Sequence, residues 1–165
     1  MGYTKVVFKR LKALSLELPE NPPPPAGEYA AYRLHAGFGF LAAQTSGYEG
    51  RFIGSVGHAI SLEQGRLAAQ TAALNALSRI HQALSGFDRL VTLLHVAGHV
   101  ASAPDFFDQP EVLDGASRLF NDVLGERGRH SRTAYGVPQL PKRMTVELEI
   151  TFAYDGCSSK PTVLF

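Results

Sequence analysis

The stretch Met144-Thr-Val-Glu-Leu-Glu-Ile-Thr-Phe-Ala-Tyr154 alternates between apolar and polar residues along most of its length. Side chains of a β-strand point to opposite faces in turn, so this period of two predicts a strand with one buried face. The strand therefore belongs to a sheet that another layer covers on one side. The apolar face comprises Val146, Leu148, Ile150 and Phe152, and the polar face comprises Thr145, Glu147, Glu149 and Thr151.

Two segments with helical periodicity supply that covering layer. The first begins at the capping box Ser61-Leu62-Glu63-Gln64, ends at Ser85-Gly86, and contains many alanines that permit close approach to a sheet. The second has Pro110 in its first turn and Gly125 after its last residue. The apolar stripe expected on the first helix consists of Leu67, Thr71, Leu74, Leu77 or Ser78, Ile80 and Leu84.

Further strands flank these helices. We expect a β-hairpin from Tyr29–Leu34 and Phe38–Gln44 around a Gly-containing turn, then a glycine-rich loop over 45–58 with one short strand near Phe52. The segments Leu90–Ser102 and Thr133–Val137 complete the sheet. The predicted class is α+β, with a mixed sheet and two long helices on one face.

The N-terminal part is predicted to be an addition to this body. An amphipathic helix is expected over about residues 4–15, followed by Leu18–Gly27, a connector that holds five of the ten prolines and favours polyproline II. A ligand for a proline-recognition domain is the less common alternative for this run. The chain of 165 residues is thus one domain, with 1–28 as helix and connector, 29–154 as core and 155–165 as tail.

Composition excludes several classes of function. The net charge is +1, so no overall field draws the protein to nucleic acid or to an anionic membrane. The single cysteine, Cys157, rules out an internal disulfide and Cys-pair zinc sites. His95 and His99 share a strand face but lie about 13 Å apart at strand rise, too far for chelation. Phosphate-cradling glycine motifs, a signal-peptide core and membrane-length apolar runs are absent, which predicts a soluble, cytoplasmic protein.

The last third of the chain carries a resemblance to a known family. The residues concerned are His99-Val-Ala-Ser-Ala-Pro-Asp-Phe106, Asp114-Gly-Ala-Ser117, Gly125, His130-Ser-Arg132-Thr-Ala-Tyr-Gly-Val137, Leu140-Pro141 and Val146-Glu-Leu-Glu149. They resemble the RidA (YjgF/L-PSP) family, and more narrowly its longer bacterial subgroup often labelled putative endoribonuclease. Tyr29 and Gln44 also fall in family positions, and the match covers about residues 5–154.

The resemblance implies a chorismate-mutase-like fold that assembles as a homotrimer with ligand clefts between subunits. Archetypal members hydrolyse enamines and imines of amino acids to 2-keto acids and ammonia without a cofactor. By motif, Arg132 would hold the substrate carboxylate, Glu147 would orient the water, and Tyr29 would form an aromatic wall across the cleft. A guanidinium fork suits a carboxylate, and a glutamate can act as base toward water. Without the resemblance, a structural ion pair on the sheet is the simpler interpretation of both residues.

The sequence also departs from the family pattern. Ala42-Ala43-Gln44 stands where the family has Ser-Gly-Gln, Asp114 replaces a common asparagine, and Ala134 replaces a frequent cysteine. A lost hydroxyl and an added negative charge argue against an unchanged small-anion substrate. The small-carboxylate or imino-acid site is therefore predicted to comprise Arg132, Tyr29, Gln44, Asp114 and Ala134 around Glu147.

Three functions follow from these residues. The first is an enamine/imine deaminase, and the second is a non-catalytic trimer that binds a small carboxylate. The third is an endoribonuclease, for which the basic residues between Arg127 and Arg143 are the local support. In that third case His130 would be a base toward a 2′-hydroxyl, although a solvated turn residue is the commoner role for a loop histidine. No face with interleaved aromatic residues favours RNA.

Overall fold

The computed structural model describes residues 2–156, so Cys157 and most of the tail expected at 155–165 lie outside the described residues. Within that range, helices and strands follow the predicted order. The elements are α1 (Tyr3–Ala13), β1 (Tyr32–His35), β2 (Phe38–Thr45), α2 (Leu62–Leu84), β3 (Leu90–Ala101), α3 (Gln109–Leu124), η1 (Gly125–Gly128), β4 (Ser131–Val137), η2 (Pro141–Arg143) and β5 (Val146–Tyr154).

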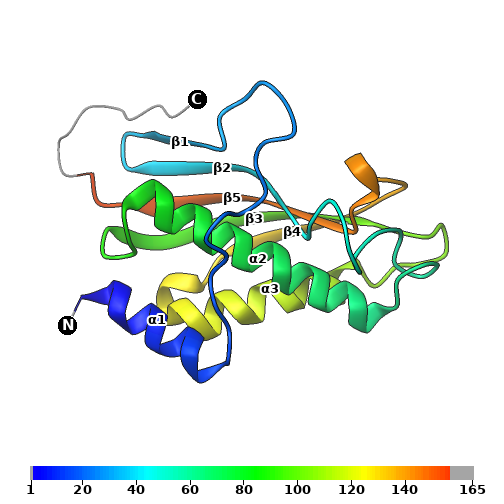
Figure 1. The fold of residues 1–165 in the computed structure, drawn as a ribbon, viewed down its shortest axis with the longest axis horizontal. Coiled ribbons are helices and arrows are strands. Elements are labelled where there is room, and N and C mark those ends of the chain that lie inside the picture. The colour runs from blue at the N-terminus through cyan, green and yellow to red at the C-terminus, as the bar shows by residue number, and fades with distance from the viewer. Residues whose placement is uncertain (1, 157–165) are drawn as a thin grey trace.

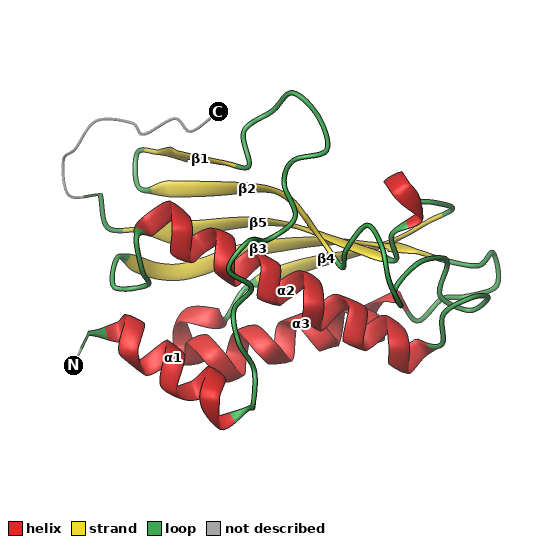
Figure 2. Ribbon diagram, viewed as in Figure 1, coloured by secondary structure: helices red, strands yellow, loops and turns green. Residues whose placement is uncertain are grey.

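The strands form one mixed sheet in the order β1-β2-β5-β3-β4 (Figure 1). All neighbours pair antiparallel except β3 and β4, which run parallel and are joined through α3. β1 and β4 are the two edges. The helices gather on one side of this sheet, which confirms the predicted α+β class (Figure 2).

The predicted hairpin and capping box are both present. Ala36 and Gly37 connect β1 to β2 with φ values of 48° and 82°, the pair of left-handed residues that a tight hairpin turn requires. In α2 the Ser61 hydroxyl accepts from the Gln64 backbone N–H, while the Gln64 side chain accepts from the backbone N–H of Ser61. These local signals were sufficient because both depend on neighbouring residues only.

The apolar stripe predicted for α2 is partly wrong. Leu77, Ile80 and Leu84 are buried, but Leu67 is 37 % exposed and Thr71 is not buried. The helix buries its alanines instead, namely Ala68, Ala69, Ala72, Ala73 and Ala76, each with no exposed surface. The cause is the close approach of α3, where a Cβ on Gly115 would collide with the carbonyl of Arg66. Small side chains are the only ones that fit between such helices.

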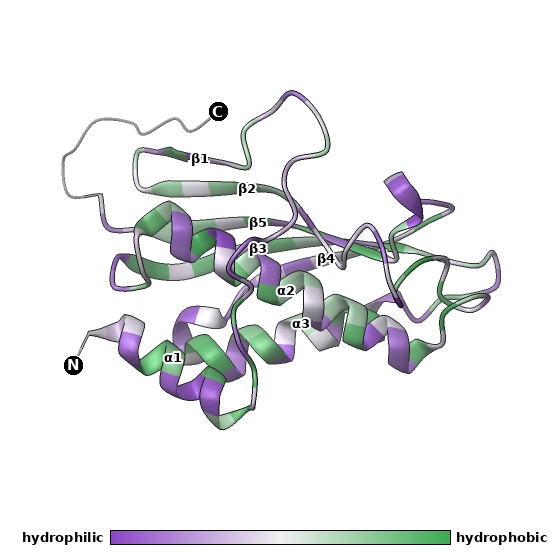
Figure 3. Cartoon of the chain, in the orientation of Figure 1, coloured by the Kyte–Doolittle hydropathy of each residue, from purple (hydrophilic) through white to green (hydrophobic). Residues whose placement is uncertain are grey.

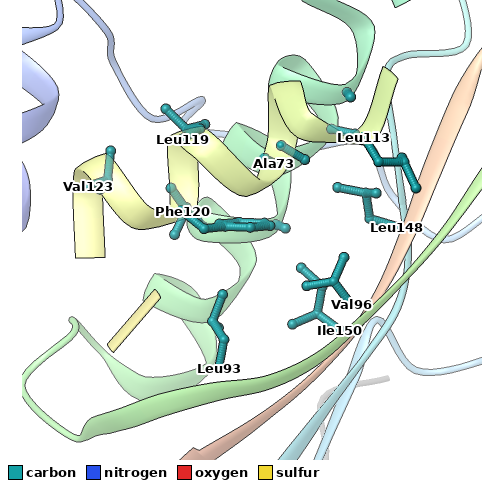
Figure 4. Close-up of a cluster of buried hydrophobic side chains, with 14 of the residues drawn as sticks. Ala73, Leu93, Val96, Leu113, Leu119, Phe120, Val123, Leu148 and Ile150 are labelled. Atoms are coloured by element: carbon teal, nitrogen blue, oxygen red, sulfur yellow. The ribbon is translucent and has the colours of Figure 1, made fainter. Parts of the chain in front are cut away.

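The core lies between the helices and the sheet (Figure 4). Its largest side chains, such as Phe120 of α3 and Phe152 of β5, are fully buried. In Figure 4 Leu113 and Phe120 of α3 lie on the side of the helix on which Val96, Leu148 and Ile150 project from the strands. The alternation predicted along β5 is confirmed, because Val146, Leu148, Ile150 and Phe152 all belong to this core.

The N-terminal helix and connector pack on the body as expected. The Tyr3 hydroxyl donates to the Leu124 carbonyl at 2.6 Å, which ties α1 to the end of α3. Helix α1 shows apolar and polar bands in Figure 3, as expected for an amphipathic helix. The proline-rich connector crosses α2, where Arg79 donates to the carbonyls of Pro22 and Pro23 at 3.3 and 2.9 Å. The connector is therefore part of the domain.

The short strand expected near Phe52 is absent from the described structure. The segment instead makes isolated bridges, from Ile53 to Met144 and from Val56 to Ile60 and Ser102. Its glycines explain this outcome: Gly47, Gly50, Gly54 and Gly57 have φ values of 113°, 93°, 118° and 89°, which interrupt extended backbone. Phe52 is nevertheless buried, at 6 % exposure.

The face of the sheet away from the helices is uncovered in the single chain. The register places Phe38, Phe40 and Tyr135 on this face, which we call the open face, and these aromatic residues are 47 %, 49 % and 52 % exposed. Polar residues of β3 and β5, including His99 and Glu147, share it. The opposite face, called the helix side below, carries the core.

Candidate functional site

Arg132 lies on the edge strand β4 and points to the helix side, because it stands in register with the buried Val96. Its Nη1 donates to Asp114 Oδ1 at 2.9 Å and to the Ser117 hydroxyl at 3.0 Å. Its Nη2 donates to the Pro110 carbonyl at 3.2 Å. A guanidinium has five N–H donors, so the second Nη2–H and the Nε–H are left for a ligand.

Asp114 and Ser117 reach Arg132 from α3. They stand three residues apart, and residues at that spacing lie on one face of a helix. The side chain of Arg132 is 21 % exposed and that of Asp114 is 41 % exposed, so the ion pair sits at the boundary between core and solvent. Arg132 and Asp114 were predicted to belong to one site, and they are in contact in the structure.

His130 extends this contact into a chain of hydrogen bonds. Its Nδ1 lies 2.6 Å from the Gly128 carbonyl, which can only accept, so Nδ1 carries the proton. Nε2 is then an acceptor, and the Ser117 hydroxyl donates to it at 3.0 Å. Burial, together with the nearby Arg132 cation, lowers the pKa of His130 from its ordinary value. His130 also packs edge-on against Phe120, so it is not the solvated turn residue that its neighbours suggested.

The polar groups around Arg132 border an open hollow of about 590 Å³. Its lining comprises Asp114, Ser117, Asn121, Arg129, His130 and Arg132. Ala134 follows two residues later on the same side of β4, where it packs against the core and presents no polar group. The hollow is thus a polar recess with one carboxylate and two guanidinium groups.

Glu147 lies on the other face of the sheet. It is in register with His99 on β3 and with Thr45 on β2. The His99 Nδ1 lies 3.7 Å from Glu147 Oε1 and 4.0 Å from Glu149 Oε1. Burial raises the pKa of Glu147, and the neighbouring Glu149 adds to the rise while His99 opposes it. A carboxyl group with a raised pKa holds a proton more readily than an ordinary glutamate, which suits a group that accepts and returns a proton.

His99 has an unusual environment. Its ring stacks on Tyr135, with centroids 5.6 Å apart and an interplanar angle of 24°. Its Nδ1 is buried and has no hydrogen-bond partner among residues 2–156. Buried ring nitrogens are normally hydrogen-bonded, so this atom marks a place where a further polar group belongs.

Tyr29 and Gln44 lie together near the β1–β2 edge of the sheet. The Tyr29 hydroxyl accepts from the Ala26 backbone N–H at 3.0 Å, and its side chain is 51 % exposed. Gln44 is buried, and its amide donates to the Ala42 carbonyl at 2.7 Å. Both border a cavity of about 10 Å³, shared with Arg79, which has room for one water at most.

The predicted site residues therefore occupy three places in a single chain. Arg132, Asp114 and Ala134 lie on the helix side of one edge, Glu147 lies on the open face, and Tyr29 and Gln44 lie near the opposite edge. Arg132 and Glu147 do not share a cleft within one chain. Tyr48 lies beside the connector, where its hydroxyl donates to the Pro24 carbonyl at 3.2 Å. Burial raises its pKa, and Tyr29 and Glu147 add to the rise.

Sequence reasoning did not assign Ser117, His99 and Tyr48 to the site. The spacing of Asp114 and Ser117 was a usable signal, since it places both on one helical face. No such signal existed for His99, because its contact with Glu147 depends on the register between β3 and β5. Tyr48 lies in the glycine-rich loop, whose path no periodicity describes.

Among residues 2–156, no three His, Cys, Asp or Glu residues gather in a way that could hold a metal ion. None of the helices described there has both the length and the apolar character to cross a membrane.

Comparison with known proteins places this geometry in a family. Residues 8–153 match the family model described as YjgF/chorismate mutase-like, putative endoribonuclease. Protein TCP17 of Trypanosoma cruzi is 35 % identical over 149 residues, which cover 87 % of this chain and 91 % of that protein. The crystal structure of Atu1372 from Agrobacterium tumefaciens has a TM-score of 0.85 and 31 % identity, covering 93 % of this chain and 95 % of that one.

A second solved structure agrees with this assignment. The putative endoribonuclease from Shewanella oneidensis has a TM-score of 0.84 and 27 % identity, over 89 % of this chain and 98 % of that one. The family model matches most of the chain, the fold agrees with the solved structures, and the residues around Arg132 fit the family motifs. This chain therefore belongs to the RidA/YjgF family, within the YjgF/chorismate mutase-like, putative endoribonuclease group.

Proposed function

We propose that this protein hydrolyses 2-imino or enamino acids to 2-keto acids and ammonia in clefts between the subunits of a homotrimer. The observation that carries the proposal is the state of Arg132 at the lip of the polar hollow. Three protein acceptors hold its guanidinium in place, and two N–H groups stay available. A fixed fork of this kind is suited to bind a small carboxylate.

The chemistry needs no cofactor because the C=N carbon of an imine is already electrophilic. Water adds to this carbon, and a carboxylate such as Glu147 takes the proton that the water loses. The same group then returns the proton to nitrogen, which gives a carbinolamine. As the C–N bond breaks, the hydroxyl proton of the carbinolamine passes to the leaving nitrogen, so the C=O bond forms and ammonia leaves. The raised pKa of Glu147 suits a group that accepts and returns one proton.

The cleft needs a second subunit, because Arg132, Tyr29 and Glu147 do not share a cleft within one chain. Arg132 lies at the β4 edge and Tyr29 near the β1–β2 edge, so a cyclic assembly that joins unlike edges unites them. The exposed Phe38, Phe40 and Tyr135 on the open face supply apolar surface for such contacts. Light scattering should then report about three times 17.9 kDa. A monomer at micromolar concentration would contradict the proposed cleft.

A specific observation favours a second candidate, a trimer that binds a small carboxylate without catalysis. Asp114 already accepts a hydrogen bond from the Arg132 guanidinium. This ion pair alone is consistent with a purely structural contact. A binding protein requires Arg132 and its hollow but makes no demand on Glu147. The two candidates therefore differ in the role of Glu147.

The third candidate, an endoribonuclease, has less support because its basic residues are engaged. Arg127 donates to the Leu90 carbonyl at 2.7 Å and packs on the Tyr3 ring, while Arg129 pairs with Glu126 at 3.2 Å. Both ring nitrogens of His130 have partners. Any RNA binding by the remaining cations should weaken steeply with salt. Salt-insensitive cleavage at selected sequences would reverse this ranking.

The deciding experiment measures ammonia and keto-acid release from enzymatically generated 2-iminopropionate and bulkier analogues. Loss of a charge-assisted pair of about 1.5–3 kcal/mol should weaken carboxylate binding by Arg132→Ala about 10- to 100-fold. Arg132→Lys should recover only part, because the ammonium lacks the planar fork. Arg118→Ala is the matched control, since Arg118 is exposed on α3 and borders a different hollow.

Glu147→Gln separates the two main candidates. A deaminase should keep its affinity for 2-keto acids in this variant and lose hydrolysis, because an amide takes no proton from water. A carboxylate-binding trimer should show no hydrolysis in the parent protein either. If Arg132→Ala binds 2-keto acids as tightly as the parent, Arg132 is a structural ion-pair partner and the proposed site is wrong.

A further inference from the structure

We propose that the hollow at Arg132 selects ligands in which a carboxylate and a protonated nitrogen are adjacent, such as an iminium acid or an amino acid, over simple carboxylates. This inference rests on the proposed function and names the charge state of its substrate. It follows from the position of Asp114. Its Oδ1 lies 2.9 Å from Arg132 Nη1, so a negative and a positive group stand side by side at one wall of the hollow.

The free hydrogen-bonding groups of this pair have opposite polarity. Arg132 keeps an Nη2–H and its Nε–H as donors after its three contacts to the protein. On Asp114, no hydrogen bond to Oδ2 is found within residues 2–156, so that oxygen stays an acceptor. A ligand that fills the hollow can therefore accept hydrogen bonds from Arg132, and it must donate one to Oδ2 of Asp114 beside it.

The charges around the hollow make Asp114 decisive. Arg129, which also lines it, is 76 % exposed and pairs with the similarly exposed Glu126 at 3.2 Å, so solvent screens its charge. His130 has a lowered pKa and is neutral at physiological pH. Asp114 supplies the one carboxylate among the residues that border the hollow. A simple carboxylate bound to Arg132 would thus lie close to a like charge, which weakens its binding.

A protonated nitrogen removes this conflict. In 2-imino and 2-amino acids the nitrogen is bonded to the carbon next to the carboxylate, so the two charges of the ligand are adjacent. The Asp114–Arg132 pair has the complementary arrangement at a similar scale. A protonated imine is also more electrophilic than the neutral form, so the selected species is the one that water attacks most readily. A 2-keto acid lacks this nitrogen and should be released.

The test compares two stable probes with the same three-carbon skeleton, pyruvate and L-alanine. Their dissociation constants are measured by calorimetry for the parent, Asp114→Asn and Arg132→Ala, with Asp122→Asn as the control for a charge removed elsewhere on α3. Asparagine keeps the shape of aspartate and an oxygen that can accept from Arg132. The parent should bind alanine more tightly than pyruvate. Asp114→Asn should bind alanine about 10-fold more weakly and pyruvate more tightly.

The outcomes separate this inference from the proposed function. If Asp114→Asn changes both affinities by the same factor, Asp114 only positions Arg132 and the charge selection is wrong, while loss of both ligands in Arg132→Ala would still support the carboxylate site. If Arg132→Ala leaves both affinities unchanged, or if the parent binds neither probe, the carboxylate site itself is wrong. A parent that prefers pyruvate overturns the charge selection alone.

Discussion

The polar groups on the two sides of the sheet differ in how completely they are hydrogen-bonded. On the helix side, Arg132, Asp114, Ser117 and His130 form a chain of hydrogen bonds of 2.6–3.0 Å that ends on the Gly128 carbonyl. On the open face, His99 stands 3.7 and 4.0 Å from two carboxylates, and its buried Nδ1 has no partner among the described residues. Each side chain of the first network has a hydrogen-bond partner within the chain, whereas the buried Nδ1 of His99 in the second has none among residues 2–156.

This difference indicates what each region contributes. A network whose bonds are satisfied internally holds its groups in a fixed geometry, which is what a binding site requires. A cluster with an unsatisfied nitrogen and exposed aromatic neighbours requires an additional partner, such as water, ligand or a second subunit. The helix side therefore contributes most to the stability of the single chain, and we expect the open face to bind the additional partner.

The largest expected difference between the two sides is in stability. Phe120→Ala removes a fully buried ring from the core and should lower the free energy of unfolding by about 3–5 kcal/mol. Phe40→Ala removes a ring that is 49 % exposed on the open face and should cost below about 1 kcal/mol in the unfolding of the dissociated single chain. Chemical denaturation of both variants checks this. Equal losses would mean that the open face is as firmly packed as the core.

Ser117 on the helix side and Ser131 on the open face allow the same comparison for single hydrogen bonds. Ser117→Ala leaves His130 Nε2 without its donor and Arg132 without one acceptor, and should cost about 1–3 kcal/mol in unfolding free energy. Ser131 makes a similar contact to His95 on the open face, at 2.8 Å, but is exposed. Ser131→Ala should cost about 0.5 kcal/mol or less, because water replaces the hydroxyl. Denaturation midpoints that reverse this order would contradict the contrast drawn here.

The pH dependence of stability gives a smaller effect on the helix side. The pKa of His130 lies below its ordinary value of 6.5, so the unfolded chain binds this proton more readily than the folded one. Stability from His130 is therefore present above pH 6.5 and is lost as the pH falls through the lowered pKa. His130→Gln should flatten the stability curve in that window. Thermal unfolding between pH 5 and 8 measures this.

Glu147 should give the opposite sign on the open face. Its pKa is raised above the usual 4.5, chiefly by burial, so the folded chain holds this proton more tightly than the unfolded one. Stability is therefore greatest below pH 4.5 for this group and decreases as the pH rises through the raised pKa. Glu147→Gln should gain stability relative to the parent across that window. A relative loss would show that ionised Glu147 has a stabilising partner.

The elements themselves were predictable because their signals are local. The alternation along β5, the capping box at Ser61 and the hairpin turn at Ala36-Gly37 depend on residues within a few positions of each other. The wrong part of the α2 stripe shows the limit of such signals. Leu67 was expected inside, but the close approach of α3 at Gly115 made the alanine face the buried one.

The sequence by itself determined the fold class and the order of elements, and its resemblance to a known family grouped Asp114 with Arg132, whose contact the structure shows. Only the tertiary structure decided that Arg132 and Glu147 stand on opposite faces of the sheet, and that His99 meets Glu147. The physical reason is strand pairing: side chains alternate between faces, so which residues meet depends on the register between segments far apart in the chain. Register follows from packing of the whole sheet, and no local pattern encodes it.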